Sequence, residues 1–90
     1  MRNMPFHMES EEGVLGSCLL DPSRIGKLEV NPEDFYDRKN QILWQTLLDM
    51  YIDNPAIDAL MIGSELEKRN QIESVGGFDR LLSLQDLIGV

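Results

Sequence analysis

The sequence has few of the residues that build reactive or metal-binding sites. Its 90 residues include one cysteine, Cys18, and one histidine, His7. A single cysteine cannot form an internal disulfide, and with one histidine it cannot supply the ligands of an ordinary zinc site. This cysteine usage favours a reducing, cytoplasmic setting. We expect Cys18 to be a small buried hydrophobe on the first helix and His7 to be solvated.

Basic residues are also scarce. Eight Lys and Arg stand against 16 Asp and Glu, which gives a formal net charge of -8. Such a chain repels phosphate backbones, so we expect little direct nucleic-acid binding. A platform that stacks bases needs a basic groove beside it, and the sequence offers none. Four aromatic residues are therefore predicted to pack in the core: Phe35, Tyr36, Trp44 and Phe78.

Long apolar runs are missing as well. No stretch approaches the roughly 18 to 20 residues of a membrane helix, and the first seven residues lack the apolar segment of a signal peptide. We therefore expect no membrane association and no export. The length allows one small globular domain and excludes a second one.

The motifs of nucleotide chemistry are absent too. The sequence contains no Gly-x-x-x-x-Gly-Lys-Ser/Thr loop and no Gly-x-Gly-x-x-Gly loop. The acid pairs Glu11-Glu12 and Glu33-Asp34 suggest a metal-dependent hydrolase, but adjacent helical positions point in different directions, and helix N-termini attract acids. Capping is the favoured interpretation. We expect no catalytic, cofactor-binding or metal-binding residue.

Helix signals fill most of the chain. Apolar spacing, prolines and capping residues predict helices at residues 9–20, 22–29, 37–52, 59–69 and from 78 onward. Asn70 is a predicted left-handed C-cap, and Gly76-Gly77 permit an unusual backbone path before the last helix. The predicted fold class is all-α, a compact orthogonal bundle of about five to six short helices.

Four blocks of sequence resemble one known family. Residues 9–21 resemble the opening signature of the N-terminal domain of bacterial and phage replicative DNA helicases, the DnaB family. Asp34-Phe35-Tyr36 with the aromatic Trp44 resembles its Asp-Phe-Tyr element, and Ile57-Asp58 its Pro-Ile-Asp segment. Residues 72–78, with Gly76-Gly77, resemble its double-glycine block. All four occur in the family's order, across roughly residues 5–84.

The resemblance implies an all-helical head of a hexameric helicase. In the family this head forms the N-terminal collar of the ring and contacts primase, through its C-terminal helicase-binding domain, and helicase loaders. It also contacts other helicase subunits. The ATP- and Mg-dependent motor is a separate domain, so no enzymatic activity is expected of these residues. A stand-alone helicase-head mimic, encoded by a phage or host, is the alternative, and a reading frame continuing past Val90 into a nucleotide-binding loop would favour the helicase.

Several positions depart from the family's pattern. Met61 replaces the usual Thr, so Asp58 is expected to cap the following helix. Asn40 and Gln41 stand where a His-Arg-like pair is usual, and Arg80 stands where an aromatic is common. After Leu84 the likeness fades. We expect residues 1–8 to form a flexible arm and residues 9–90 a domain truncated before the family's last helix and hairpin.

Two sets of residues are candidates for specific roles. Exposed positions inside the matched blocks are candidates for contacting primase, with Arg80 changing an apolar contact into a charged one: Glu9, Glu73 and Arg80. Residues expected to shape the fold are Gly16, Asp34, Phe35, Trp44, Asp58, Gly76 and Gly77. Gly16 is expected to allow the close approach of another helix.

Overall fold

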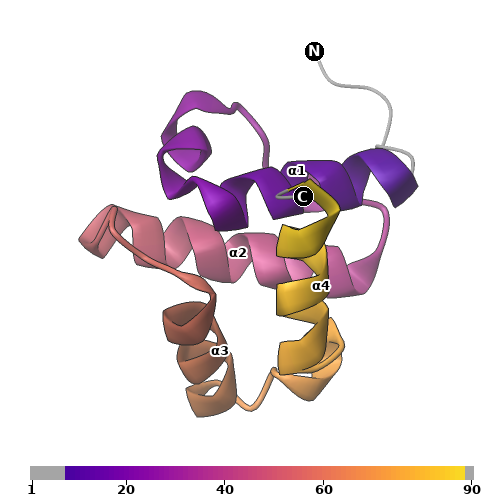
Figure 1. The fold of residues 1–90 in the computed structure, drawn as a ribbon, viewed down its shortest axis with the longest axis vertical. Coiled ribbons are helices and arrows are strands. Elements are labelled where there is room, and N and C mark those ends of the chain that lie inside the picture. Colours follow the sequence, from indigo (N-terminus) through magenta and orange to yellow (C-terminus); the bar gives the residue numbers. More distant parts are fainter. Residues whose placement is uncertain (1–7, 89–90) are drawn as a thin grey trace.

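Four α-helices and three 3₁₀ turns make up the described part of the chain (Figure 1). The structure is a computed structural model that describes the backbone of residues 8–88 and the side chains of residues 11–87. The elements are α1 (Met8–Leu20), η1 (Pro22–Lys27), η2 (Pro32–Asp34), α2 (Arg38–Asp53), α3 (Ala59–Lys68), η3 (Glu73–Val75) and α4 (Phe78–Ile88). The predicted arm at residues 1–8 falls almost wholly outside the described residues.

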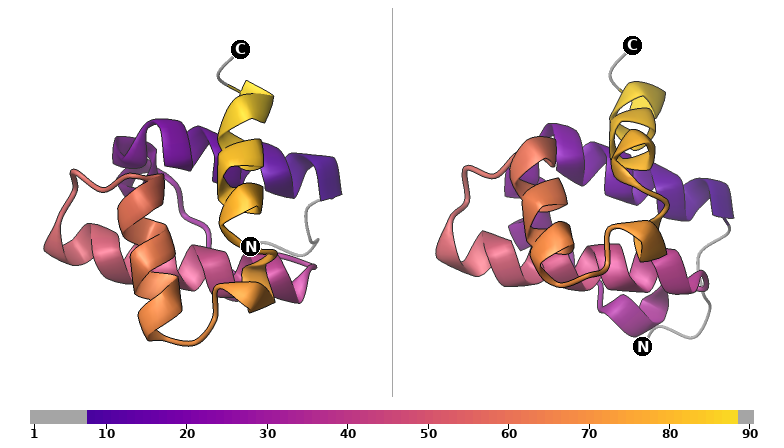
Figure 2. Two further views of the ribbon diagram at one scale, coloured as in Figure 1. Left: turned by 60° about the horizontal axis from the view of Figure 1, so that its bottom comes forward. Right: turned by 90° about the horizontal axis from the view of Figure 1, so that it is seen from below.

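The helices form two pairs that cross. α1 and α2 run side by side, and α3 and α4 run across them (Figures 1 and 2). The most extensive contact between elements joins α1 to α4, which are far apart in the sequence. The molecule measures 33 × 29 × 24 Å. The predicted all-α orthogonal bundle is confirmed, and no helix within residues 8–88 is long and apolar enough to cross a membrane.

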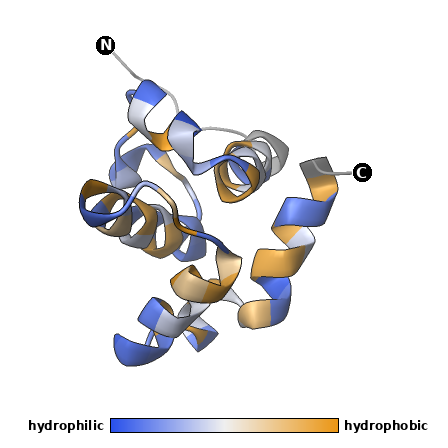
Figure 3. Ribbon diagram, turned by 60° about the vertical axis from the view of Figure 1, so that its left-hand side comes forward, coloured by the Kyte–Doolittle hydropathy of each residue, from blue (hydrophilic) through white to orange (hydrophobic). Residues whose placement is uncertain are grey.

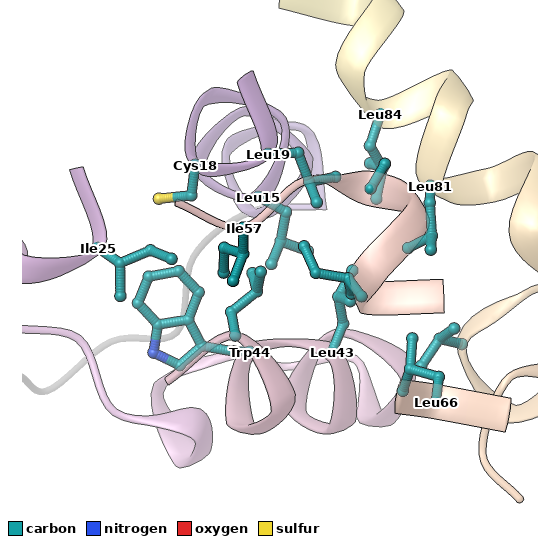
Figure 4. Close-up of a cluster of buried hydrophobic side chains, with 14 of the residues drawn as sticks. Leu15, Cys18, Leu19, Ile25, Leu43, Trp44, Ile57, Leu66, Leu81 and Leu84 are labelled. Atoms are coloured by element: carbon teal, nitrogen blue, oxygen red, sulfur yellow. The ribbon is translucent and has the colours of Figure 1, made fainter. Parts of the chain in front are cut away.

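The core lies where the two pairs cross, and each helix contributes apolar residues at three- and four-residue spacing (Figure 4). Hiding each such side chain from water stabilises the fold by about 1.5–3 kcal/mol. The buried apolar side chains of the four helices are Leu15, Cys18, Leu19, Leu43, Trp44, Leu47, Ala59, Ile62, Leu66, Leu81 and Leu84. The helices carry both orange and blue bands in the hydropathy view, as amphipathic helices do (Figure 3).

Two of the four aromatic residues that were predicted to pack in the core do so. Trp44 and Phe35 are buried with ring centroids 5.5 Å apart, and Trp44 Nε1 donates a 2.9 Å hydrogen bond to the Val30 carbonyl. The prediction was wrong for Tyr36, which is 76% exposed, and for Phe78, which is 36% exposed. Tyr36 lies in the turn before α2, where its backbone is held and its ring is left in solvent.

The ends of α3 follow the sequence closely. Asp58 accepts a 2.9 Å hydrogen bond from the Met61 N–H, so it caps the helix as expected. Asn70 has a φ of 58°, which confirms the left-handed position. Next to it, the Gln71 N–H donates to the Leu66 carbonyl at 2.7 Å, as in a Schellman motif.

One segment differs from the helix prediction. Residues 22–29 were expected to be one helix, but η1 is a 3₁₀ helix that ends at Lys27. Leu28 then has an extended backbone and is 40% exposed, instead of packing beside Ile25. At the other end of the chain, α4 continues beyond Leu84 to Ile88, where the sequence likeness was expected to fade. Gln85 supports this extension, since its Nε2 donates to the Leu19 carbonyl at 3.2 Å.

Candidate functional site

A buried carboxylate lies at the start of α2. Glu11 is fully buried, and its side chain accepts hydrogen bonds from the Tyr36 N–H, from the Asp37 N–H at 3.4 Å and from Asn40 Nδ2 at 2.7 Å. Asp37 is the N-cap of α2, so the negative charge sits near the positive end of that helix dipole. The expectation that Glu11 serves its own helix start was therefore wrong: it holds the start of another helix.

The same network continues to Arg80. Its Nη2 donates to Asn40 Oδ1 at 2.7 Å and lies 3.6 Å from Glu12 Oε2, while Nη1 donates to the Val75 carbonyl at 3.2 Å. The side chain of Arg80 is only 15% exposed. The expectation that Arg80 faces solvent was wrong, because α4 presents it to α1 and α2. We call Glu11, Glu12, Asn40 and Arg80 the polar network.

The three predicted partner-contacting residues are not gathered into one site by the described contacts. Glu73 is exposed and begins η3. Arg80 lies in the polar network, and the side chain of Glu9 is outside the described ones. Of the three, Glu73 alone is a described exposed carboxylate.

The double glycine links Glu73 to Arg80. Gly76 and Gly77 have φ values of 101° and 84°, so both adopt the left-handed conformation that side chains disfavour. A Cβ on Gly76 would lie 2.6 Å from Arg80 Cδ, whereas one on Gly77 would meet nothing within 4 Å. The predicted unusual path is confirmed, and Gly76 also makes room for Arg80.

The other structural candidates occupy defined places. Gly16 is buried on α1. Asp34 accepts a 2.8 Å hydrogen bond from the Asn31 N–H, which closes the turn before Phe35. These residues shape the backbone that carries the polar network, and they bring no reactive group together.

The described residues offer little chemistry. Burial raises the pKa of the Cys18 thiol to about 11, so it is a thiol and not a nucleophilic thiolate near pH 7. Among residues 11–87, no three His, Cys, Asp or Glu side chains are grouped so that they could hold a metal ion. The carboxylates of Glu11 and Asp58 accept backbone N–H groups.

Several grooves open on the described surface, and two of them are lined partly by apolar residues. The α1–η1 groove has a volume of about 730 Å³ and is lined by Gly13, Val14, Ser17, Asp21, Arg24, Lys27 and Leu28. The α3–α4 groove has a volume of about 310 Å³ and is lined by Leu60, Gly63, Ser64, Glu67, Ile72 and Phe78. At the second groove a Cβ on Gly63 would lie 2.7 Å from the Phe78 ring, so the missing side chain lets that ring pack on α3.

Sequence reasoning missed the polar network as a unit. It marked Asn40 and Arg80 as departures from the family's pattern, and the structure shows that these two side chains are hydrogen-bonded to each other. Two positions that both depart from the family's pattern and then contact each other could in principle be found as a pair by sequence comparison. The α1–η1 groove gave no such signal, because its lining depends on where η1 ends.

Comparisons with known proteins all point to one protein family. The family model described as the DnaB-like helicase N terminal domain matches residues 3–89. The replicative DNA helicase DnaB of Synechocystis is 27% identical over 91% of this chain, that of Rhodothermus marinus 32% over 80%, and that of Geobacillus stearothermophilus 30% over 93%. The chain spans only 10%, 8% and 19% of these relatives.

A solved structure shares the fold. The crystal structure of the N-terminal domain of DnaB helicase from Mycobacterium tuberculosis superposes with a TM-score of 0.87 and 28% identity, covering 98% of this chain and 64% of that one. The match therefore extends over α1 to α4 with their order and crossing intact. The chain belongs to the family of DnaB-like helicase N-terminal domains.

Proposed function

We propose that this chain acts as a protein-interaction and assembly module of a replicative DNA helicase, contacting primase and contributing to the collar of the helicase ring. The observation that carries the proposal is the family match over residues 3–89. The relatives bear the name replicative DNA helicase, and the chain corresponds to a fifth or less of their length. On this proposal ATP and Mg²⁺ are bound by a motor domain outside these residues, and a loader is a further partner.

Surface charge supports a protein partner over DNA. The chain carries a net charge of -8, and two of its eight basic residues, Arg69 and Arg80, lie within 4 Å of carboxylates while being largely buried. Arg69 is paired with both Asp49 and Glu65, at 3.0 and 2.9 Å. The remaining six basic residues are outnumbered by the 16 acidic ones, so the net charge disfavours the phosphate contacts that dominate nucleic-acid affinity.

Glu73 is the described residue best placed for primase contact. It is exposed at the start of η3, directly before the double-glycine turn. Arg80 supports this turn from inside through its bond to the Val75 carbonyl. We therefore assign Arg80 the role of positioning the turn that carries Glu73, and Glu9, at the start of α1, stays a proposed contact without a described side chain.

A calorimetric titration tests the proposal. The 90-residue chain is titrated with the C-terminal helicase-binding domain of the cognate primase and, separately, with single- and double-stranded DNA. We expect binding to the primase domain and none to DNA at 150 mM salt. Glu73→Lys should weaken primase binding, while Asp53→Lys, an equal charge change at the exposed end of α2, should not. Tight, salt-sensitive DNA binding without primase binding would overturn the proposal.

A further inference from the structure

The α1–η1 groove is the larger of the two grooves, and nothing in the described fold fills it. Its walls are one face of α1 and the 3₁₀ helix η1 with the residue that follows it. Its apolar side chains are Val14, which is half-buried, and Leu28, which is 40% exposed. About 730 Å³ is room for several side chains of a docked segment, and it falls within the range of natural ligand sites.

Gly13 keeps this groove open. It lies inside α1, where glycine is a poor helix former, and it has no positive φ that would require a glycine. A Cβ there would meet no atom of the described residues within 4 Å. Gly63 differs, because the Phe78 ring already occupies the space above it. Packing within the fold therefore does not require glycine at position 13, whereas the open space of the groove does depend on the missing side chain.

The groove carries positive charge on a strongly acidic chain. Arg24 and Lys27 are exposed in its wall; Arg24 lies 3.7 Å from Asp21, and Lys27 has no carboxylate within 4 Å among the described residues. The pKa of Asp21 is lowered, first by the hydrogen bond from Ser23 Oγ and further by Arg24 and Lys27. Two cations against one carboxylate leave a site that attracts acids.

We propose that the α1–η1 groove binds an acidic amphipathic helix of a partner protein, with apolar side chains entering the space beside Gly13 and carboxylates pairing with Arg24 and Lys27. The apolar floor and the basic rim match the two faces of such a helix. A second copy of this chain fits less well, because each copy carries a charge of -8. Nucleic acid fits less well too, since two cations neutralise few phosphates and no aromatic side chain lines the groove.

The proposal does not depend on primase binding, since it names a different surface from the one that carries Glu73. Nuclear magnetic resonance on the ¹⁵N-labelled chain provides the test. The probe is a synthetic 16-residue helical peptide with a leucine stripe flanked by glutamates, and its control has lysine in place of every glutamate. We expect saturable amide shifts centred on residues 13–17 and 24–28 with the acidic peptide and none with the basic one.

Matched variants separate binding from folding. Lys27→Glu should weaken binding of the acidic peptide by about fivefold or more. Lys68→Glu, the same change at the exposed end of α3, should leave the affinity for this peptide unaltered. Gly13→Leu should abolish binding without lowering the melting temperature, because its side chain enters the open groove. The proposal would be overturned if the peptide shifted amides at the α3–α4 groove instead, or if both peptides bound equally well. It would also be overturned if the shifts depended on protein concentration without peptide, or if an oligonucleotide bound the same residues.

Discussion

Arg80 on α4 donates a 2.7 Å hydrogen bond to Asn40 on α2, and Asn40 donates one of the same length to Glu11 on α1. This chain of side chains joins three helices through residues that are 29 and 40 positions apart in the sequence. No side-chain nitrogen or oxygen that is buried among the described residues lacks a hydrogen-bond partner. A satisfied polar network of this kind fixes one arrangement of helices, because every alternative leaves polar groups unpaired.

Glu11→Ala should be among the most damaging single changes. It removes the acceptor of the Tyr36 N–H and of Asn40 Nδ2, and leaves buried donors without partners. We expect a loss of about 2–4 kcal/mol in the free energy of unfolding, measured by urea denaturation. Glu12→Ala is the matched control: Glu12 is more exposed, with one 3.6 Å contact, and should cost under about 0.5 kcal/mol. Equal losses would show that the network contributes nothing beyond surface charge.

Gly76→Ala should cost more than Gly77→Ala. Both alanines are held at a positive φ, which costs about 1 kcal/mol each. Only the Cβ at position 76 also meets Arg80, at 2.6 Å from Cδ. In an Arg80→Ala background, which removes Cδ and keeps the Arg80 Cβ at 3.2 Å, the difference between the two penalties should shrink, and a double-mutant cycle of unfolding free energies measures this. A difference that is as large without the long Arg80 side chain as with it would contradict the assigned role.

Gly16→Leu should lower the melting temperature by several degrees, because Gly16 is buried in α1 and a large side chain there overpacks the core. Gly13→Ala, three residues earlier in the same helix, should raise stability by about 0.5–1 kcal/mol, since its Cβ meets nothing and alanine favours the helix. Circular dichroism melting of both variants checks the contrast. Two changes of the same sign would show that the packing of α1 has been misassigned.

Stability should fall at alkaline pH through Cys18. Its folded-state pKa is raised from 9.0 to about 11, because burial disfavours the thiolate. The folded chain therefore holds this proton more tightly than the unfolded one, and the contribution is complete below pH 9 and lost as the pH rises towards 11. The full loss is roughly 1–3 kcal/mol. In denaturation at pH 8 and pH 11, Cys18→Ala should show a smaller loss than the parent, and an equal loss in both proteins would contradict this account.

The sequence predicts the helices well and their long-range polar contacts poorly. Helix positions follow from local signals: the apolar spacing in α2, the proline at η1, the cap at Asp58 and the left-handed Asn70. The buried role of Glu11 does not, because an acid near a helix start has a local explanation in its own helix dipole. The fold brings Glu11 next to the start of α2, whose backbone N–H at Tyr36 lies 25 residues away in the chain, and a local pattern cannot show this contact.

The candidate surfaces show the same division. Glu73 was expected to be exposed, and it is, because a short turn beside glycines leaves little room for burial. Arg80 lies three residues after Gly77, yet α4 directs it inward to Asn40. Tyr36 was expected to pack and is exposed, and Leu28, at the end of the helix expected over residues 22–29, is exposed as well, because apolar patterns do not encode the turn geometry at either residue.

Sedimentation velocity tests the central claim, that this acidic head binds proteins and not DNA, most directly. The 90-residue chain is sedimented alone, with the helicase-binding domain of the cognate primase, and with single-stranded DNA. The account predicts a faster boundary with the primase domain and an unchanged one with DNA. An unchanged boundary with the primase domain, together with a faster one with DNA, would contradict it.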